Sequence, residues 1–451
     1  MYDPKIFKSY DIRGIYPSQI DEDVAYKLGQ GYANFIKPKK PIAVGYDVRI
    51  HSKELQKKVI EGLLDAGVDV VDIGLISTEM YYFAVGNFRY SGGIMLTASH
   101  NPAEWHGAKM VREKVIPLSS ESGLLEIKDF IESGEKIIAS QKGKLTKKDI
   151  LDDFCRYVLS WIDAKKIKPQ KIVYNPNFGF EGKVFQRIIE LGKLPLEIIG
   201  INDKPDGTFP KGRPDPFVPE NRPETTSLIQ KVKADLGVAW DADADRVFFF
   251  DGDGNFLDSY FVNTLLIKKM LVKYPGGKII YDPRYTWALI EAALAAGGKS
   301  ILERVGHGFI KERMRKEDAV FAGESSGHTY YRDFWYADCG IIPFLQIIEI
   351  VSEKRKSLKE LLTPVKSKYF ISGEINFTTQ HAEKIMENAK KRYKEGKIET
   401  LDGVSIEYPD WRFNLRSSNT EPLLRLNLEA KSKELMEEKK KELIDFINKL
   451  T

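Results

Sequence analysis

Short apolar runs alternate with amphipathic helical patterns along most of this chain of 451 residues. In the first round, apolar runs at 41–47 and 68–74 flank Leu55, Val59 and Leu63, which recur at helical spacing. Short apolar runs predict buried strands, and strands that alternate with helices favour an α/β fold. Because the pattern restarts twice, the sequence predicts three related α/β units.

The later rounds and the C-terminal part define the predicted domains. A further strand that runs into a polar turn is expected at 92–102. Other strands are expected at 171–176, 194–201, 235–240, 277–282 and 319–324, with an Ala-rich helix at 288–296. A lysine-rich segment, 352–368, separates these rounds from a different ending. That ending has alternating segments at 369–377 and 423–430 and a charged amphipathic helix at 431–448, which together predict a smaller α+β domain. The predicted domains are 1–150, 151–255, 256–367 and 368–451.

Charge and cysteine content exclude several classes of protein. The formal net charge is only +4, too small for an electrostatic nucleic-acid binder. The two cysteines, Cys155 and Cys339, lie outside any CxxC pattern, which argues against a structural zinc site and for a reducing compartment. The N-terminus lacks a secretory pattern, and the most apolar run, 341–351, is too short to span a bilayer. We therefore expect a cytoplasmic protein that binds neither nucleic acid nor a membrane.

The segment Asp241-Ala-Asp-Ala-Asp-Arg246 places three carboxylates directly after the apolar run 235–240. Such carboxylates repel one another unless a cation joins them, and oxygen ligands favour a hard ion such as Mg²⁺. An EF-hand is excluded, because Arg246 stands at the loop position that requires glycine. An acidic surface turn is the alternative. The nearby Asp251-Gly-Asp-Gly254 is instead predicted to be a hairpin turn.

The segment Thr97-Ala-Ser-His-Asn-Pro102 also follows an apolar run and presents a hydroxyl in a tight turn. Ser99 could carry a phosphoryl group covalently if a divalent ion and positive groups surround it. A turn or capping serine is the plain alternative. A Ser-His-Asp triad using His100 is a second alternative, although no GxSxG nucleophile motif occurs in the chain.

Two further polar loops suit a phosphorylated sugar. Arg416-Ser-Ser-Asn-Thr-Glu-Pro422 combines a guanidinium with hydroxyl and amide groups, as a phosphate site requires, or forms a plain hairpin turn. Gly323-Glu-Ser-Ser-Gly-His328 offers groups that recognise sugar hydroxyls, or marks a β-turn. The absence of a Walker loop argues against ATP as the phosphate donor. Weaker single candidates are Arg13, Lys109, Arg284 and His307.

Five of these motifs, in this order, resemble the α-D-phosphohexomutase family, and most of all its bacterial phosphomannomutase/phosphoglucomutase branch. They are FKSYDIRG (7–14), TASHNP (97–102), DADADR (241–246), GESSGH (323–328) and RSSNTEP (416–422). The resemblance runs through nearly the whole chain. It implies four domains around a central cleft, three of related α/β topology and a smaller fourth.

The resemblance also implies a function for each candidate residue. Ser99 would be the phosphoserine that donates and recovers the phosphoryl group. Mg²⁺ would be held by that serine together with Asp241, Asp243 and Asp245. The cations near the transferring phosphate would be Arg13, Lys109 and Arg246. The sugar would be contacted by Glu324, Ser326 and His328, with Arg284 and His307 on loops of the third domain, and the unreacting phosphate by Arg416, Ser418, Asn419 and Thr420.

The activity implied by the resemblance is the reversible interconversion of hexose 1-phosphate and hexose 6-phosphate, for mannose and glucose. It would pass through a hexose 1,6-bisphosphate, which would also act as activator, and the enzyme would be a monomer or homodimer. Phosphoglucosamine mutase is the alternative within the family. A sugar phosphatase and a non-catalytic sugar-phosphate binding protein are the alternatives from other classes.

The chain departs from the family pattern at two places. Ala242 and Ala244 replace the two glycines of the usual Asp-Gly-Asp-Gly-Asp-Arg loop. Alanine resists positive φ, so either this loop uses ordinary backbone angles or strain in it weakens metal binding. The family's Tyr-Asn-Gly becomes Trp105-His106-Gly107, which makes His106 either a proton carrier or a packing residue.

Overall fold

The computed structural model describes residues 3–417 and 422–450 and divides into two compact units. Unit 1 comprises Met1–Leu257 and Ser326–Ser357, and unit 2 comprises Asp258–Ser325 and Leu358–Thr451. Each unit contains two main groups of hydrogen-bonded strands with their associated helices. The predicted α/β class, with a distinct C-terminal α+β part, is confirmed.

The first sheet of unit 1 has the strand order β1-β5-β4-β2-β3-β7, with β6 beside β5. Strands β4, β2, β3 and β7 run parallel, whereas β1, β5 and β6 are antiparallel to their neighbours. The strands are β1 (Ile12–Ile15), β2 (Ile42–Tyr46), β3 (Val70–Leu75), β4 (Gly92–Leu96), β5 (Trp105–Arg112), β6 (Ile116–Pro117) and β7 (Leu145–Lys147). The helices are α1 (Glu22–Ile36), α2 (Ser52–Asp65), α3 (Thr78–Asn87) and α4 (Leu124–Ser133).

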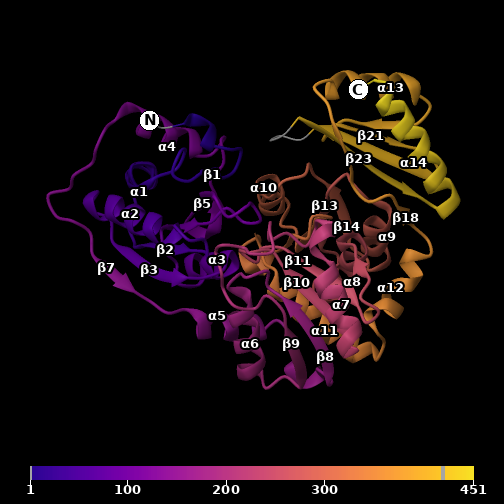
Figure 1. The fold of residues 1–451 in the computed structure, drawn as a ribbon, viewed down its shortest axis with the longest axis horizontal. Coiled ribbons are helices and arrows are strands. Elements are labelled where there is room, and N and C mark those ends of the chain that lie inside the picture. The colour runs from indigo at the N-terminus through magenta and orange to yellow at the C-terminus, as the bar shows by residue number, and fades with distance from the viewer. Residues whose placement is uncertain (1–2, 418–421, 451) are drawn as a thin grey trace. The chain divides into compact units, whose positions relative to one another are not determined.

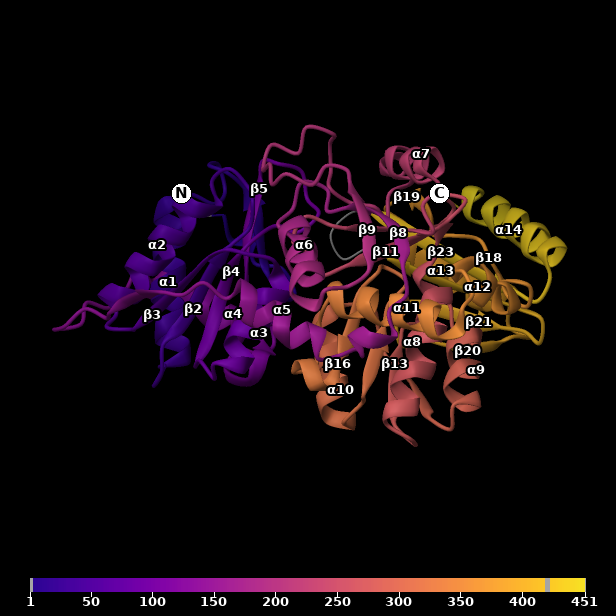
Figure 2. The ribbon, with the colours of Figure 1, turned by 90° about the horizontal axis from the view of Figure 1, so that it is seen from below.

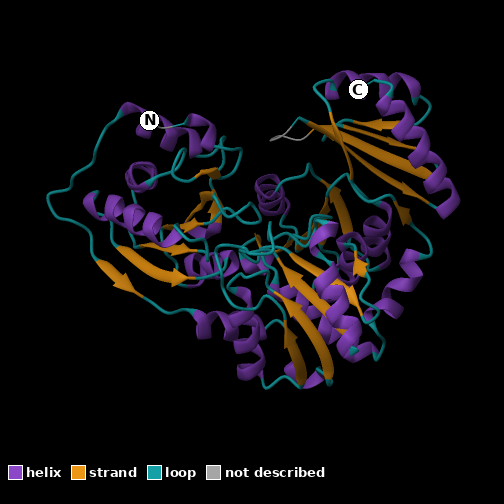
Figure 3. Cartoon of the chain, in the orientation of Figure 1, coloured by secondary structure: helices purple, strands orange, loops and turns teal. Residues whose placement is uncertain are grey.

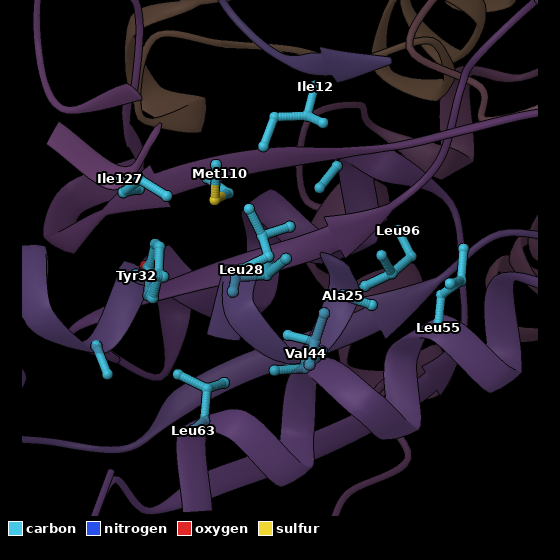
Figure 4. Packing of buried hydrophobic residues seen from close by; sticks show 14 of the residues in the cluster. Ile12, Ala25, Leu28, Tyr32, Val44, Leu55, Leu63, Leu96, Met110 and Ile127 are labelled. Atoms are coloured by element: carbon cyan, nitrogen blue, oxygen red, sulfur yellow. The ribbon is translucent and has the colours of Figure 1, made fainter. Parts of the chain in front are cut away.

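Helices α1 and α2 cover one face of this sheet, and α3 packs on the other (Figures 1 and 2). Figure 4 shows Leu28 of α1 and Leu55 of α2 close to Val44 of β2 in one apolar cluster. The two helices approach closely because their contact contains glycines. A Cβ atom on Gly29 would lie 2.3 Å from the Val59 carbonyl oxygen, so any larger residue would push the helices apart.

The second sheet of unit 1 has the order β12-β11-β10-β8-β9, in which β10, β8 and β9 are parallel. Its strands are β8 (Gln170–Asn175), β9 (Leu196–Gly200), β10 (Leu236–Trp240), β11 (Val247–Asp251) and β12 (Phe256–Leu257). The associated helices are α5 (Leu151–Leu159), α6 (Glu181–Gly192), α7 (Pro223–Val232) and α11 (Ile341–Lys354). The unit also contains the antiparallel pair β16 (Thr329–Tyr331) and β17 (Ala337–Asp338).

Unit 2 begins with three parallel strands in the order β14-β13-β15. These strands are β13 (Lys278–Tyr281), β14 (Lys299–Leu302) and β15 (Phe321–Gly323). The accompanying helices are α8 (Ser259–Lys273), α9 (Trp287–Ala295), α10 (His307–Glu317) and α12 (Leu358–Lys366).

The C-terminal part of unit 2 is an antiparallel sheet in the order β18-β23-β22-β21-β20, with β19 also paired to β23. Figure 3 shows its two helices beside these strands, and their apolar side chains share one core with the sheet. The strands are β18 (Phe370–Ile371), β19 (Ile375–Thr378), β20 (Lys397–Glu399), β21 (Val404–Glu407), β22 (Trp411–Ser417) and β23 (Leu423–Ala430), and the helices are α13 (Ala382–Arg392) and α14 (Lys433–Asn448).

The run 92–102 is a strand to Leu96 and then a polar loop, as predicted. The segment 369–377 is two strands, since Gly373 between them adopts φ +72°. The hairpin turn predicted at Asp251–Gly254 is confirmed between β11 and β12, where the Gly254 N–H donates to the Asp251 carbonyl. Among the described residues, no helix combines the length and apolar character needed to cross a bilayer.

Candidate functional site

The serine loop follows β4 and runs from Thr97 to Pro102 before β5 begins. Ser99 is buried and adopts φ +49°, a left-handed conformation that is uncommon for a residue with a side chain. Its N–H donates to Thr97 Oγ1 at 2.9 Å, which closes the turn. The Ser99 hydroxyl lies 3.0 Å from Asp241 Oδ2 and 3.1 Å from His100 Nδ1.

The acidic loop connects β10 to β11 within unit 1, at the carboxyl end of a buried parallel strand. Asp241, Asp243 and Asp245 are all buried, and one carboxylate oxygen from each lies within 4.8 Å of the others. The structure therefore brings the three predicted carboxylates together with Ser99. The alternative of an acidic surface turn is excluded, because these side chains are buried.

Buried cations offset part of this negative charge. Lys109 of β5 donates to Asp243 Oδ2 at 2.7 Å and also contacts Asp245, while Arg246 Nε donates to Asp241 Oδ2 at 2.8 Å. Burial alone would lower the pKa of Lys109, but the two neighbouring carboxylates outweigh it and raise this pKa. Burial, with further repulsion from the other two carboxylates, raises the pKa of Asp241 to about 7 in spite of Arg246. In spite of burial, the cationic neighbours Lys109, His328 and Arg246 instead hold the pKa of Asp245 well below its usual value.

The donor set fits a hard divalent cation. Asp243 Oδ1 is buried and makes no hydrogen bond to any described residue, although Asp243 Oδ2 accepts from Thr78 Oγ1 and Lys109. A buried acceptor without a donor is costly unless a cation satisfies it. The acidic loop can therefore hold a metal ion, with oxygen ligands alone.

His328 extends this cluster from the segment that precedes β16. Its Nε2 lies 3.5 Å from Asp245 Oδ1, and its Nδ1 lies 3.3 Å from Ser326 Oγ. Asp245, His328 and Asp338 form a second group whose potential ligand atoms are within 4.8 Å of one another. In contrast, the structure gives the Ser-His-Asp triad no third member, since no described carboxylate is hydrogen-bonded to the other ring nitrogen of His100.

Arg13 of β1 also reaches the serine loop. Its Nε donates to Asp11 Oδ2 at 2.8 Å, and its NH1 contacts Asn101 Oδ1 and the Ala98 carbonyl oxygen. The guanidinium is thus anchored to the loop that carries Ser99. In unit 1, the structure therefore brings Ser99, the three carboxylates, Lys109, Arg246, Arg13, His328 and Ser326 into one cluster.

The remaining described candidates lie in unit 2. Arg284 NH2 lies 2.8 Å from Asp282 Oδ2 and 3.2 Å from Glu324 Oε2. Arg416, on β22, is buried, and both burial and the charge of Arg284 lower its pKa. His307 is the first residue of α10, not part of a loop. Ser418, Asn419 and Thr420 lie outside the described residues.

Of the two alternatives for the backbone of the acidic loop, ordinary angles hold at Ala242, whereas Ala244 is strained. Ala244 adopts φ +61°, whereas Ala242 keeps a negative φ. The fold imposes the left-handed conformation where the loop turns from β10 into β11, because the Ala244 N–H donates to the Asp241 carbonyl. A left-handed residue with a Cβ costs about 1–2 kcal/mol.

This asymmetry predicts opposite backbone effects of the same substitution. Both alanine methyls are buried, so Ala244→Gly and Ala242→Gly lose similar packing, but only the first relieves a positive φ. We expect the first variant to be more stable than the second by about 1 kcal/mol or more, measured by chemical denaturation. Equal stability of the two variants would show that Ala244 carries no strain.

His106 on β5 is a packing residue in this structure. Its ring is buried beside Tyr16 and His51, and neither ring nitrogen is hydrogen-bonded to a described residue. Burial, then the charges of Arg49 and His51, lower the pKa of His106 to about 3. An imidazole that stays neutral and makes no polar contact is poorly suited to carry protons.

Several residues of the site were missed by the sequence analysis. Arg49 and Arg213 donate to backbone carbonyls of the serine loop, and Asp215 lies 3.4 Å from Arg246 NH1. Thr78, at the start of α3, donates to Asp243 at 2.7 Å. Arg49 lies three residues after the end of β2, so its place beyond a parallel strand is the one signal that could have identified it.

A buried carboxyl pair lies elsewhere in unit 1. Glu79 of α3 accepts from the N–H groups of Gly340 and Ile341, at 2.8 and 3.1 Å, and from the Cys339 thiol. Glu181 of α6 is fully buried beside it. Burial raises the pKa of Glu79 to about 7, and burial with repulsion from Glu79 raises the pKa of Glu181 well above its usual value.

The Glu181 carboxyl therefore retains a proton in the folded chain at a pH where the unfolded chain has lost it. Its contribution to stability is fully present below the unfolded pKa, near 4.5, and is lost as pH rises toward the folded pKa. We expect Glu181→Gln to make the free energy of unfolding less pH-dependent between pH 5 and 8, by up to about 1.4 kcal/mol per pH unit. Urea denaturation across this range measures the effect, and identical slopes for the two proteins would contradict it.

Comparison with known proteins places this architecture among the phosphoryl-transferring sugar mutases. The phosphoglucomutase/phosphomannomutase sequence models match in four parts: α/β/α domain I at residues 4–137, domain II at 152–254, domain III at 258–369 and the C-terminal domain at 374–446. The chain belongs to the phosphoglucomutase/phosphomannomutase family.

Individual relatives match over nearly their full length. A phosphomannomutase of Vibrio cholerae is 44% identical over 98% of both chains, and a phosphomannomutase of Escherichia coli K12 is 40% identical over 98% of both. A phosphoglucomutase/phosphomannomutase family protein from Burkholderia thailandensis superposes with a TM-score of 0.88 at 28% identity, covering 100% of this chain and 97% of that one.

Proposed function

We propose that this chain is a phosphomannomutase/phosphoglucomutase, which interconverts the 1-phosphates and 6-phosphates of mannose and glucose. The observation that carries the proposal is the position of the Ser99 hydroxyl, 3.0 Å from one carboxylate of a buried acidic triad. Lys109 and Arg246 are bonded to that triad, and Arg13 contacts the loop that carries Ser99. Phosphoryl transfer depends mainly on positioning and charge neutralisation, and this cluster supplies both.

In the proposed reaction, Ser99 is first phosphorylated by a hexose 1,6-bisphosphate. The P–O bond to Ser99 then breaks as the phosphorus bonds to a free sugar hydroxyl, and the proton of that hydroxyl passes through a neighbouring base to the released Ser99 oxygen. The product is a hexose 1,6-bisphosphate, which turns end for end and returns its other phosphoryl group to Ser99. Lys109 and Arg13 balance the charge of the transferring group and hold its oxygens.

The acidic loop is proposed to hold Mg²⁺ through Asp241, Asp243 and Asp245. When bound, this ion supplies positive charge to the transferring phosphoryl group. Arg246 fixes the orientation of Asp241 by a hydrogen bond of 2.8 Å, and Lys109 fixes that of Asp243. These contacts hold the loop in a shape suited to the ion.

Substrate recognition is assigned to two further groups of residues. The sugar hydroxyls are proposed to contact Glu324, Ser326 and His328. Arg284 and His307 are proposed to contact the same sugar. The phosphate that does not react is proposed to bind Arg416 with Ser418, Asn419 and Thr420. A grip on a second phosphate is needed by a mutase and not by a sugar phosphatase or a passive sugar-phosphate sensor.

The proposal also covers where the enzyme acts and in which oligomeric state. We propose a cytoplasmic enzyme, monomeric or homodimeric, that acts without nucleic acid or a membrane. The near balance of charges and the two buried thiols support this proposal. Light scattering coupled to size-exclusion chromatography would determine the oligomeric state.

The proposed function is tested by turnover of glucose 1-phosphate and mannose 1-phosphate side by side, with Mg²⁺ and trace glucose 1,6-bisphosphate. Comparable kcat/KM on both sugars is expected. Activity confined to glucosamine 1-phosphate would transfer the assignment to phosphoglucosamine mutase. Release of free phosphate, or no reaction with any of the three sugars, would refute the mutase.

A further inference from the structure

The carbonyl oxygens of the serine loop are directed at arginine side chains. A single guanidinium, that of Arg49, donates to three of them, Ser99 and Asn101 at 2.7 Å each and Pro102 at 2.6 Å, and also to the carbonyl of Trp105, the first residue of β5, at 2.9 Å. Arg49 thus contacts the residue that carries the hydroxyl, the C-terminal end of the loop and the start of the next strand. Charge-assisted bonds of this kind are stronger than ordinary backbone contacts.

The two carbonyls that Arg49 does not reach have arginine partners of their own. The Ala98 oxygen lies 3.4 Å from Arg13 NH1, and the His100 oxygen lies 3.1 Å from Arg213 Nε. All five consecutive carbonyl oxygens from Ala98 to Pro102 therefore face guanidinium groups, and Arg49 serves three of the five.

Arg49 itself is held rigidly. Its side chain is 0% exposed, its Nε lies 3.2 Å from Asp47 Oδ2, and its guanidinium lies 5.0 Å from the ring centre of Phe209. Asp47 is fixed in turn by Ser52 Oγ, which donates to its Oδ1 at 2.7 Å. Burying a charge in this way is costly unless the charge is fully paired, and here each side of the fork has a partner.

The backbone of Ser99 needs such support. Its φ of +49° is unfavourable for a residue with a Cβ, and left-handed residues persist only where the surroundings over-determine them. Arg49 donates to the carbonyl of Ser99 itself, and Arg13 contacts the Ala98 carbonyl that precedes it. From the backbone held in this way, the Ser99 hydroxyl reaches Asp241 Oδ2 at 3.0 Å.

We propose that Arg49 is a positioning residue for phosphoryl transfer, which holds the serine loop so that the Ser99 oxygen stays in line for reaction. Arg49 touches neither the hydroxyl nor the acidic triad directly. It acts through the backbone, and its effect falls on the chemical step and not on substrate binding. This inference rests on the proposed function of Ser99.

The test compares Arg49→Lys and Arg49→Ala with a control, Arg187→Lys. The control alters a solvent-accessible ion pair between Arg187 on α6 and Asp152 on α5. Lysine keeps the charge but has no planar fork, so it cannot serve four carbonyls. We expect Arg49→Lys to lower kcat by about 100-fold with KM changed less than about 3-fold, because small misplacements of a reacting group cost about this much. Phosphorylation of Ser99 by labelled glucose 1,6-bisphosphate is expected to slow by the same factor.

Two further measurements separate positioning from general damage. Added guanidinium ion is expected to restore part of the kcat of Arg49→Ala, normalised to folded protein, and to leave Arg187→Lys unchanged. Amide hydrogen exchange is expected to rise in the segment 97–105 of Arg49→Lys and not in the rest of unit 1. The exchange readout does not depend on activity, so it tests the loop even if the proposed reaction is wrong.

Three results would contradict the positioning role of Arg49. An unchanged kcat in Arg49→Lys, a loss carried by KM alone, or unaltered exchange at 97–105 would each overturn the proposal. If the wild-type protein turned over none of the hexose phosphates while the exchange result held, the proposed function would fail and the structural role of Arg49 would stand.

Discussion

Replacing Ser99 with alanine is expected to abolish mutase turnover while leaving the fold intact. The substitution removes the only hydroxyl within hydrogen-bond distance of Asp241 that the serine loop provides, and with it the atom that would carry the phosphoryl group. Neither charge nor volume changes much, so the loop contacts to Arg49 should survive. We expect kcat to fall by at least about 10⁴-fold, since no other route replaces the covalent step.

The control for this variant is Ser122→Ala, which removes a partly buried hydroxyl in the same unit that bonds to Ser119 and to the Pro117 carbonyl. Both variants should unfold within about 1 kcal/mol of the wild type, as expected for loss of one hydrogen bond. Labelling with ³²P from glucose 1,6-bisphosphate should occur in the control and disappear in Ser99→Ala. Near-normal turnover by Ser99→Ala would remove this residue from the carrier role.

Replacing Asp243 with asparagine is expected to have the second large effect on turnover. Asp243 Oδ2 already accepts from Thr78 and Lys109, and its Oδ1 has no described hydrogen-bond donor, so the charge of this group is arranged for a cation. Asparagine lowers the negative charge and directs an amide toward the same donors. We expect kcat to fall by about 10³-fold or more and Mg²⁺ binding, measured by calorimetry, to weaken beyond detection.

Asp253→Asn provides the matched control. Asp253 lies in the acidic turn between β11 and β12, a segment of similar composition with a different structure. This variant should retain wild-type activity and Mg²⁺ affinity. Tight Mg²⁺ binding by Asp243→Asn would falsify the assignment of the acidic triad as the metal site.

Most of the candidate site could be predicted because the ends of the strands could be located from the sequence. The serine loop and the acidic loop each follow an apolar run, and the structure places them at the ends of β4 and β10. The carboxylates of the acidic loop could be recognised because buried like charges need a cation. The three-round pattern likewise predicted the α/β class, since strand and helix periodicities differ.

The rest depends on contacts between segments far apart in the chain. Arg49 and Ser99 are separated by 50 positions, and no periodicity links a lone arginine to the carbonyls that it will contact. The left-handed angle at Ala244 could not be read from residue type, because alanine disfavours it and only the turn into β11 imposes it. The split of the third family domain between the two units is a property of packing, which local sequence does not encode.

The two cysteines make the native state chemically observable. Cys155 lies near the Val184 carbonyl between α5 and α6, and Cys339 donates to Glu79 at the start of α11, so both thiols are fully buried and their pKa values are raised by burial. A thiol reagent can react with either sulfur only after the surrounding structure opens. The rates at which the two thiols are labelled therefore report how readily the structure around each of them opens, with no engineered probe in the chain.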